Sequence, residues 1–280
     1  PEICVPIKIY NGHVINLLNQ NVDYIFAPRM VSIEKNKTFC PKFLGLPDML
    51  RYTFAGEADK FISPFINGVS DEDVNIKELH DANLLKEYSF HELSHAWRAG
   101  VDDWRHFRKI CQRGYRLDEA MELYRNPQLP PVKESLGKVG IGLIGYVYDV
   151  YDQFVGMDIA KRLESMGVNV YTFEMLTESE IKKQIQPMKK SLFWSFSNKT
   201  FGAGMHFYGD PRVDGLIHLT AFGCGPDSLS GKMMELDSPR YAKPFLTVRV
   251  DEHSGENHLQ TRIEAFVDLL LHKKIKQSTL

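Results

Sequence analysis

The chain has 280 residues, a formal net charge of -2 at pH 7, and 43% hydrophobic and 25% charged residues. This composition is typical of a folded globular protein and argues against a disordered chain or a disulfide scaffold. The small net charge argues against a broad basic surface for nucleic acid. No cationic leader precedes an apolar core, and the longest nearly apolar run, residues 139–148, is too short to span a bilayer. We therefore expect a cytoplasmic protein without a membrane segment.

The N-terminal part of the chain alternates between predicted helix and predicted strand. We expect a short helix at residues 12–18, a buried strand at 22–26, a renewed helical pattern from residue 45, and a second β-prone run at 60–66. Alternation of this kind indicates an α/β layer.

Residues 79–124 form the longest region of predicted helix. Their apolar side chains recur every three or four positions on one face, which comprises Leu93, Trp97, Val101, Trp104, Phe107, Cys111 and Tyr115. The proline-rich segment 126–131 then interrupts regular structure. We therefore expect a domain border there, with an N-terminal α/β domain over residues 1–130 and a C-terminal one over 131–280.

The second domain shows the clearest alternation. Its pattern predicts a strand at 139–146, a helix at 157–166 that ends at Gly167, strands at 168–173, 215–221 and 245–250, and a closing amphipathic helix at 259–271. This order favours a mostly parallel sheet with helices on both faces.

The spacing His91-Glu92-x-x-His95 matches the helical motif of zinc proteases. Both histidines fall opposite the apolar face, which favours a solvated helix face that carries this spacing by chance. Glu119 and Glu122 could be proposed as a third ligand, but on one unbroken helix they would lie about 40 Å away. The solvated face is therefore our interpretation, and a zinc metallohydrolase is the alternative.

A second motif, Gly140-x-Gly142-x-x-Gly145, matches the dinucleotide fingerprint in letters. That fingerprint follows a strand and opens a helix, whereas these glycines lie inside the predicted strand. Close packing of a buried strand is the interpretation we favour.

The four cysteines are far apart in the sequence, which favours reduced thiols or a metal site over disulfides. Cys111 lies on the apolar helix face and is expected to be a buried core residue. Cys4, Cys40 and Cys224 lie in predicted loops beside proline or glycine. Such loops are suited to thiolate ligands, but no Cys-x-x-Cys anchors the set, so ordinary thiols and a shared metal site both stay open.

Cys224 lies between Gly223 and Gly225, directly after a predicted strand. Backbone at glycine can approach a cluster closely and donate N–H bonds to its sulfurs. The carboxyl end of a parallel strand is also where open α/β sheets bind their ligands. We therefore expect both glycines to contribute to cofactor binding.

Five segments occur in an order that resembles the 2-hydroxyacyl-CoA dehydratase superfamily, in particular its activase-related proteins. They are EICVPIKIYNGHV, VDYIFAPRMVSI, CPKFLGLPDMLR, LTAFGCGPDS and VRVDEHSGENHLQTRIEAFVD. The resemblance covers residues 2–268, and the helical insert at 79–126 is its least characteristic part. It implies two Rossmann-like α/β domains with mostly parallel sheets, and an oxygen-sensitive 4Fe–4S cluster held by Cys4, Cys40 and Cys224 in the cleft between them.

With three thiolates, one iron would have an open position and could act as a Lewis acid as well as an electron relay. In the dehydratases, an ATP-driven activator delivers one low-potential electron, and a ketyl radical of the acyl-CoA then loses hydroxide. The resemblance thus implies an activator or electron-donor protein as partner and an acyl-CoA or other small molecule as substrate. The sequence leaves open a lyase or reductase activity, a homodimer, and a cluster-free interaction module.

Two departures from the family pattern concern the ends of the chain. Asn257 and His258, directly after Glu256, are bulky where the family has small residues. This departure leaves the role of the preceding Asp251, Glu252 and His253 open. These three residues could supply proton transfer near the cluster, or could form a capped loop between strand and helix. The strand and helix that usually precede the first cysteine motif are absent, so we expect them upstream of residue 1.

Overall fold

The computed structural model describes residues 3–32, 35–69, 72–81 and 85–278. Two compact units make up the chain: the first comprises Pro1–Pro6, His106–Ser191 and Ser197–Leu280, and the second comprises Ile7–Arg105 and Leu192–Phe196. The domain border expected near residue 130 stays a prediction, because compactness alone does not show which segments fold independently. Among the described helices, none has both the length and the apolar character needed to cross a membrane.

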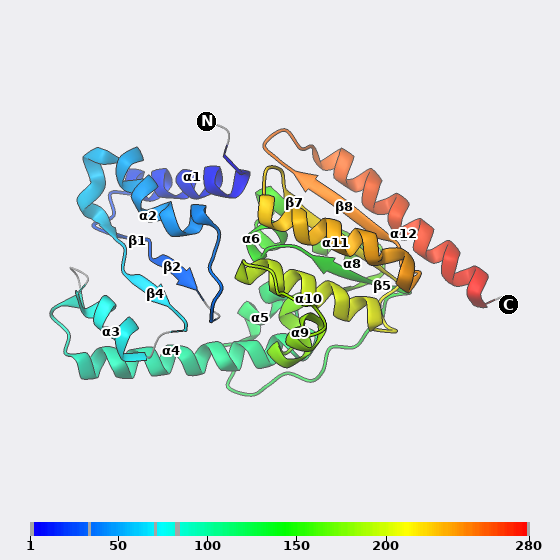
Figure 1. Ribbon diagram of the computed structural model, residues 1–280, viewed down its shortest axis with the longest axis horizontal. Coiled ribbons are helices and arrows are strands. Elements are labelled where there is room, and N and C mark those ends of the chain that lie inside the picture. The colour runs from blue at the N-terminus through cyan, green and yellow to red at the C-terminus, as the bar shows by residue number, and fades with distance from the viewer. Residues whose placement is uncertain (1–2, 33–34, 70–71, 82–84, 279–280) are drawn as a thin grey trace. The chain divides into compact units, whose positions relative to one another are not determined.

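The second unit combines helices with two short pairs of parallel strands (Figure 1). Its elements in chain order are α1 (Val5–Asn19), β1 (Ile25–Phe26), β2 (Arg29–Ser32), α2 (Pro41–Thr53), the 3-10 helix η1 (Ala55–Lys60), β3 (Phe61–Ile62), β4 (Phe65–Asn67), α3 (Glu72–Asp81) and α4 (Phe90–Cys111). The first two residues of α1 and the last six of α4 belong to the first unit. The β-prone run expected at 60–66 is two strands, β3 and β4, because Pro64 between them has no N–H to donate to a ladder. The strands β1 and β3 pair in parallel, as do β2 and β4.

The helical region expected at 79–124 contains separate helices, and its residues 82–84 lie outside the described part of the chain. Helix α4 ends at Cys111, Gly114 then adopts a φ of 93°, and α5 (Leu117–Leu123) follows. A left-handed glycine just past the last turn is a common helix terminator. The predicted helical region is therefore divided at Gly114, and Trp104, expected on its apolar face, is 57% exposed.

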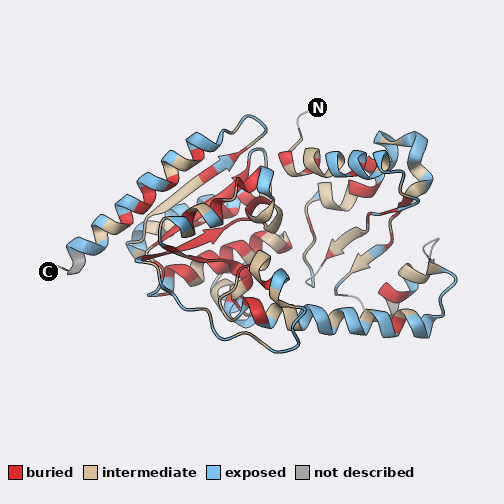
Figure 2. Cartoon of the chain, turned by 180° about the vertical axis from the view of Figure 1, so that it is seen from behind, coloured by how far each residue is buried: buried red, intermediate tan, exposed pale blue. Residues whose placement is uncertain are grey.

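The first unit is built on a four-stranded parallel sheet with strand order β6-β5-β7-β8. Its strands are β5 (Val139–Ile144), β6 (Val168–Tyr171), β7 (Gly215–Ala221) and β8 (Phe245–Val250). Every residue of β5 and β7 is buried, as Figure 2 shows in red. A strand buried on both faces is expected to be a nearly continuous apolar run, as these two are. The strand pairing confirms the mixed α/β class with mostly parallel sheets.

Helices cover both faces of this sheet. Gly215 of β7 faces Phe266 and Leu270 of α12 (Glu256–Ser278), whereas the next residue, Leu216, faces Gly204 of α10 (Ser195–Gly209). Successive side chains of a strand point to opposite faces, so α12 and α10 lie on opposite sides. The remaining helices of this unit are α6 (Val147–Tyr151), α7 (Gln153–Gly156), α8 (Ile159–Ser165), α9 (Glu178–Ile185), α11 (Gly225–Tyr241) and the 3-10 helix η3 (Phe173–Met175).

The glycines of the dinucleotide-like motif are packing residues. A Cβ atom at Gly140 would lie 2.0 Å from the carbonyl oxygen of Arg212, and one at Gly142 would lie 2.8 Å from the ring of Phe207. Gly140 and Gly142 lie within β5, and no helix begins where the fingerprint requires one. The packing interpretation of these glycines is thus supported by the space around them.

Candidate functional site

The strand order creates a switch point at the carboxyl ends of β5 and β7. Strand β6 lies on one side of β5 and β7 on the other, so the chain reverses its direction of winding between them. Helix α6 follows β5, and α11 follows β7 (Figure 1). Open α/β sheets bind their ligands at such a point, because the loops after the two strands diverge there.

Cys224 lies at this switch point as the residue that precedes α11. Its thiol is partly buried, and the backbone N–H of Asp227 hydrogen-bonds to its sulfur. Burial raises the pKa of Cys224 to about 12, and Asp227, Asp149 and Cys4 add to the rise when they are ionised. Two of the three expected ligands, Cys4 and Cys224, are therefore within electrostatic range of each other in the first unit.

All three expected cysteine ligands lie directly before a helix. Cys4 precedes α1, Cys40 is the N-cap of α2, and Cys224 is the N-cap of α11. In each case a proline, respectively Pro6, Pro41 or Pro226, occupies the first or second helical position. The N–H groups of a first helical turn have no intrahelical acceptor, so they can donate to a sulfur or to an anionic cluster.

These thiols match an iron–sulfur cluster in the chemistry of their donors, since thiolates with nearby backbone N–H groups are its usual ligands. Cys40 belongs to the second unit, and the other two cysteines belong to the first. Among the residues that the structure describes, no group of three or more His, Cys, Asp or Glu side chains is arranged to hold a metal ion. The cluster and its ligand set stay predictions.

Two buried carboxyl groups lie beneath Cys224. Asp149 of α6 and Asp227 of α11 are both 0% exposed. The Oδ2 atom of Asp227 lies 3.1 Å from Nε2 of His218, a β7 residue that is 1% exposed. A Cβ atom at Gly231 would lie 2.3 Å from Cε1 of His218, so only glycine leaves room for this ring.

Hydrogen bonds connect the loops after β5 and β7 through α10. The hydroxyl oxygens of Tyr146 and Ser197 are 3.0 Å apart, and the Ser197 hydroxyl donates to the carbonyl of Pro226 at 3.2 Å. Ser230 donates to the carbonyl of Asp227 at 2.9 Å. The switch point is therefore a connected, buried polar region within the first unit.

Asp149, Asp227 and His218 were not predicted from the sequence. One signal could have found them: His218 and Thr220 are polar residues inside a strand that is otherwise apolar and buried on both faces. A polar side chain at such a position needs a partner from a neighbouring element, and for His218 that partner is Asp227.

The histidines of the zinc-protease spacing, His91 and His95, are exposed on α4. The carboxylate of Glu92 accepts hydrogen bonds from the backbone N–H of Ser89 at 2.8 Å and from its hydroxyl at 2.7 Å, while the Glu92 N–H donates to that hydroxyl. This reciprocal pattern is a capping box, which gives Glu92 a role in starting the helix. The exposed positions agree with the solvated face expected from the sequence.

Asp251, Glu252 and His253 lie in the loop between β8 and α12. The carboxylate of Asp251 accepts hydrogen bonds from the His253 N–H at 2.9 Å and from the Ser254 hydroxyl at 3.0 Å. These bonds hold the pKa of Asp251 below its ordinary value of 3.8. The geometry gives Asp251 a local role in shaping the loop, and proton transfer by these residues stays a prediction.

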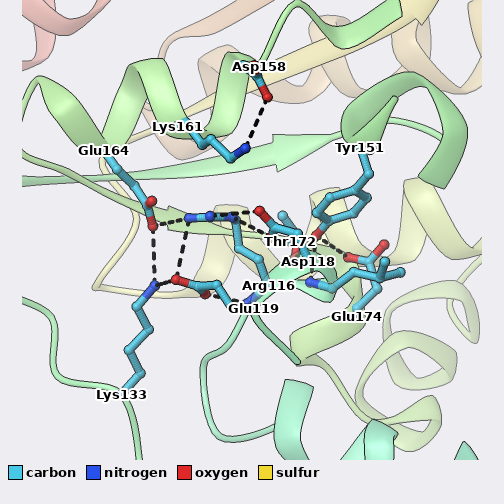
Figure 3. A network of polar contacts seen from close by, with 11 residues as sticks. Arg116, Asp118, Glu119, Lys133, Tyr151, Asp158, Lys161, Glu164, Thr172 and Glu174 are labelled. Atoms are coloured by element: carbon cyan, nitrogen blue, oxygen red, sulfur yellow. Dashed lines mark hydrogen bonds and ion pairs between the residues drawn. The ribbon is translucent and has the colours of Figure 1, made fainter. Parts of the chain in front are cut away.

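A second polar network lies around Arg116, which is 4% exposed at its side chain (Figure 3). Arg116 pairs with Asp118 at 3.0 Å, with Glu119 at 3.8 Å and with Glu164. Lys133 joins Glu119 at 2.6 Å and Glu164 at 3.2 Å. The network ties α5 to α8, and Lys133 and Glu164 also line a cavity of about 360 Å³ beside β6. Its charges are paired with one another, which indicates a structural role.

A family model described as CoA enzyme activase uncharacterised domain (DUF2229) matches residues 1–176. The match covers more than half of the 280 residues and includes Cys4 and Cys40. It supports the activase relationship expected from the sequence, but it does not single out a 2-hydroxyacyl-CoA dehydratase component. No curated protein matches the chain.

Proposed function

Because this chain belongs to the CoA enzyme activase uncharacterised domain family, we propose that it is a redox component of a system that activates a CoA enzyme. It binds a 4Fe–4S cluster through Cys4, Cys40 and Cys224. The observation that supports this most is the position of these cysteines: each directly precedes the positive end of a helix, and at Cys224 the N–H of Asp227 donates to the sulfur.

When bound, the cluster supplies a low-potential one-electron relay and one iron with an open position. The chain itself contributes the sulfurs, the N–H of Asp227 at the sulfur of Cys224, and Gly223 and Gly225 as bare backbone beside it. The proposal requires the second unit to present Cys40 to the two cysteines of the first. This arrangement is the cleft between Rossmann-like halves that the sequence resemblance implies.

An activase-type role requires a partner enzyme, and an ATP-dependent electron donor fits the same role. The dehydration of an acyl-CoA by the chain itself is a further part of the proposal, supported by sequence resemblance alone. Electron relay needs only the cluster, whereas a lyase or reductase activity needs a substrate site as well.

The test is anaerobic reconstitution of the full chain with iron and sulfide. We expect brown protein with about four irons per chain, whose colour bleaches with dithionite. Cys4→Ser, Cys40→Ser and Cys224→Ser should each lower the iron content, whereas Cys111→Ser, with its buried core thiol, should retain it.

Equal loss of iron in all four variants, or in none, would contradict the ligand assignment. One zinc per chain together with a peptidase activity that Glu92→Gln abolishes would support the zinc hydrolase instead. A colourless, metal-free product from an anoxic preparation would support the interaction module.

A further inference from the structure

The carboxyl group of Asp149 is buried without a hydrogen-bond partner of normal geometry. The residue is 0% exposed, and neither Oδ1 nor Oδ2 has such a partner among the described residues. An ionised carboxylate in this position would have lost its hydration, and the backbone N–H of Ala221 would compensate only part of that loss. A carboxyl group in these surroundings retains its proton, because the neutral form costs far less to bury.

Asp227 differs from Asp149 although both are fully buried. The Oδ2 atom of Asp227 lies 3.1 Å from Nε2 of His218, and Oδ1 lies 3.4 Å from the hydroxyl of Ser230. Oδ1 of Asp227 thus has the Ser230 hydroxyl as a partner, and Oδ2 lies at contact distance from His218 without a hydrogen bond of normal geometry among the described residues. Asp149 instead has the carboxyl group of Asp227 as its neighbour. When two nearby carboxyl groups have such different surroundings, the one without partners is the one that holds the proton.

We propose that Asp149 is a proton store: in the folded protein at neutral pH its carboxyl group stays protonated beneath Cys224, next to the Asp227–His218 pair. Its O–H can then serve as a hydrogen-bond donor or proton source at the switch point. A negatively charged group bound at this edge of the sheet meets one buried negative charge there instead of two. The inference goes beyond the proposed function, since it needs only the first unit and holds whether or not a cluster binds.

The charged groups around Asp149 support this assignment. Burial raises the pKa of Asp149 well above its ordinary value of 3.8, and the charge of Asp227 from α11 raises it further. The backbone N–H of Ala221 at the end of β7 opposes the rise, and Asp152 at the start of α7 adds to it. His218 of β7 also lies in this region, with its Nε2 3.1 Å from Oδ2 of Asp227.

Infrared spectroscopy of the full chain tests the proposal directly. A protonated carboxylic acid has a carbonyl band separate from that of a carboxylate, and the band shifts in heavy water. We expect this band at neutral pH in the wild-type protein, its loss in Asp149→Asn, and its retention in Asp268→Asn, which changes an exposed aspartate of α12. In Asp227→Asn the band should persist but disappear at a lower pH, because one negative charge has been removed.

Urea unfolding gives a second, independent readout. A group whose pKa is higher in the folded than in the unfolded state stabilises the fold below the unfolded value, and this contribution is lost as pH rises through the folded value. Asp149→Asn should therefore unfold at a higher urea concentration than the wild type at neutral pH, with a difference that shrinks toward pH 4. A wild-type protein without the band, or a variant that is less stable at neutral pH and equal in acid, would overturn the proposal. If Asp149→Asn does not fold, Asp227→Asn decides the matter: a band that disappears at a lower pH in this variant supports the proposal, and an unchanged band overturns it, because another buried acid such as Glu174, whose pKa burial also raises, lies away from Asp227 in the sheet.

Discussion

Gly140 provides a sharp test of whether the glycine motif of β5 is a packing feature. In Gly140→Ala the new methyl group would lie 2.0 Å from the backbone oxygen of Arg212, which has no flexible end that could move away. Gly140 also exchanges two hydrogen bonds with Asp214, from its N–H to Oδ2 at 2.8 Å and to its carbonyl from the Asp214 N–H at 2.7 Å. Overpacking costs about 1–3 kcal/mol and each lost hydrogen bond about 1 kcal/mol, so we expect a loss of roughly 3–5 kcal/mol.

Two further variants grade this effect in urea unfolding experiments. Gly142→Ala meets the ring of Phe207 at 2.8 Å and should cost less, about 1–3 kcal/mol, because a side chain can shift. Gly45→Ala in α2 meets nothing within 4 Å and should stabilise its helix by up to about 1 kcal/mol. Unchanged stability in Gly140→Ala would refute the packing argument. A dinucleotide that binds the wild type but not Gly140→Ala would revive the fingerprint interpretation.

Three other predictions concern the first unit. Arg116→Met should lower the free energy of unfolding by about 1–3 kcal/mol, because Asp118 loses its cationic partner while Lys133 still pairs with Glu119 and Glu164, whereas the exposed Arg105→Met should cost about 0–1 kcal/mol. Burial alone would raise the pKa of Asp118, but Arg116 holds it below 3.8, so the Arg116 effect should diminish as pH falls below that value. Gly231→Ala should cost about 1–3 kcal/mol in urea unfolding, because its Cβ would displace the ring of His218. Cys111→Ser should cost about 1–3 kcal/mol and Cys111→Ala less in the same assay, since only serine places a hydroxyl in the apolar cluster with Ile110 and Ala120.

The parallel sheet of the first unit could be predicted because its strands are buried on both faces. The bounds of β7 and β8 agree with the expected runs 215–221 and 245–250, since nearly continuous apolar stretches leave little choice of register. The apolar periodicity of residues 79–124 did not reveal where the first helix ends, because the apolar repeat continues across the turn at Gly114. The repeat follows the core on both sides of the turn, so it cannot locate the helix end by itself.

The buried carboxyl pair could not be predicted in the same way. Asp149 and Asp227 are far apart in the chain, and the sheet brings them together by placing β5 beside β7. Either residue alone, shortly after a strand, is typical of an exposed helix start. Only the strand order shows that both positions lie inside, and strand order depends on contacts that no local pattern encodes.

The cysteines illustrate how the two kinds of information combine. Cysteine beside proline suggested a loop, whereas the structure shows helix starts, where proline is tolerated because the first N–H groups need no intrahelical acceptor. A helix start ordinarily favours a reactive thiolate, yet burial and the neighbouring charges raise the pKa of Cys224 to about 12, so the free thiolate is scarce at neutral pH. This combination argues against Cys224 as a free nucleophile. A bound cation such as iron would reverse the balance, because it stabilises the thiolate that Asp227 otherwise opposes.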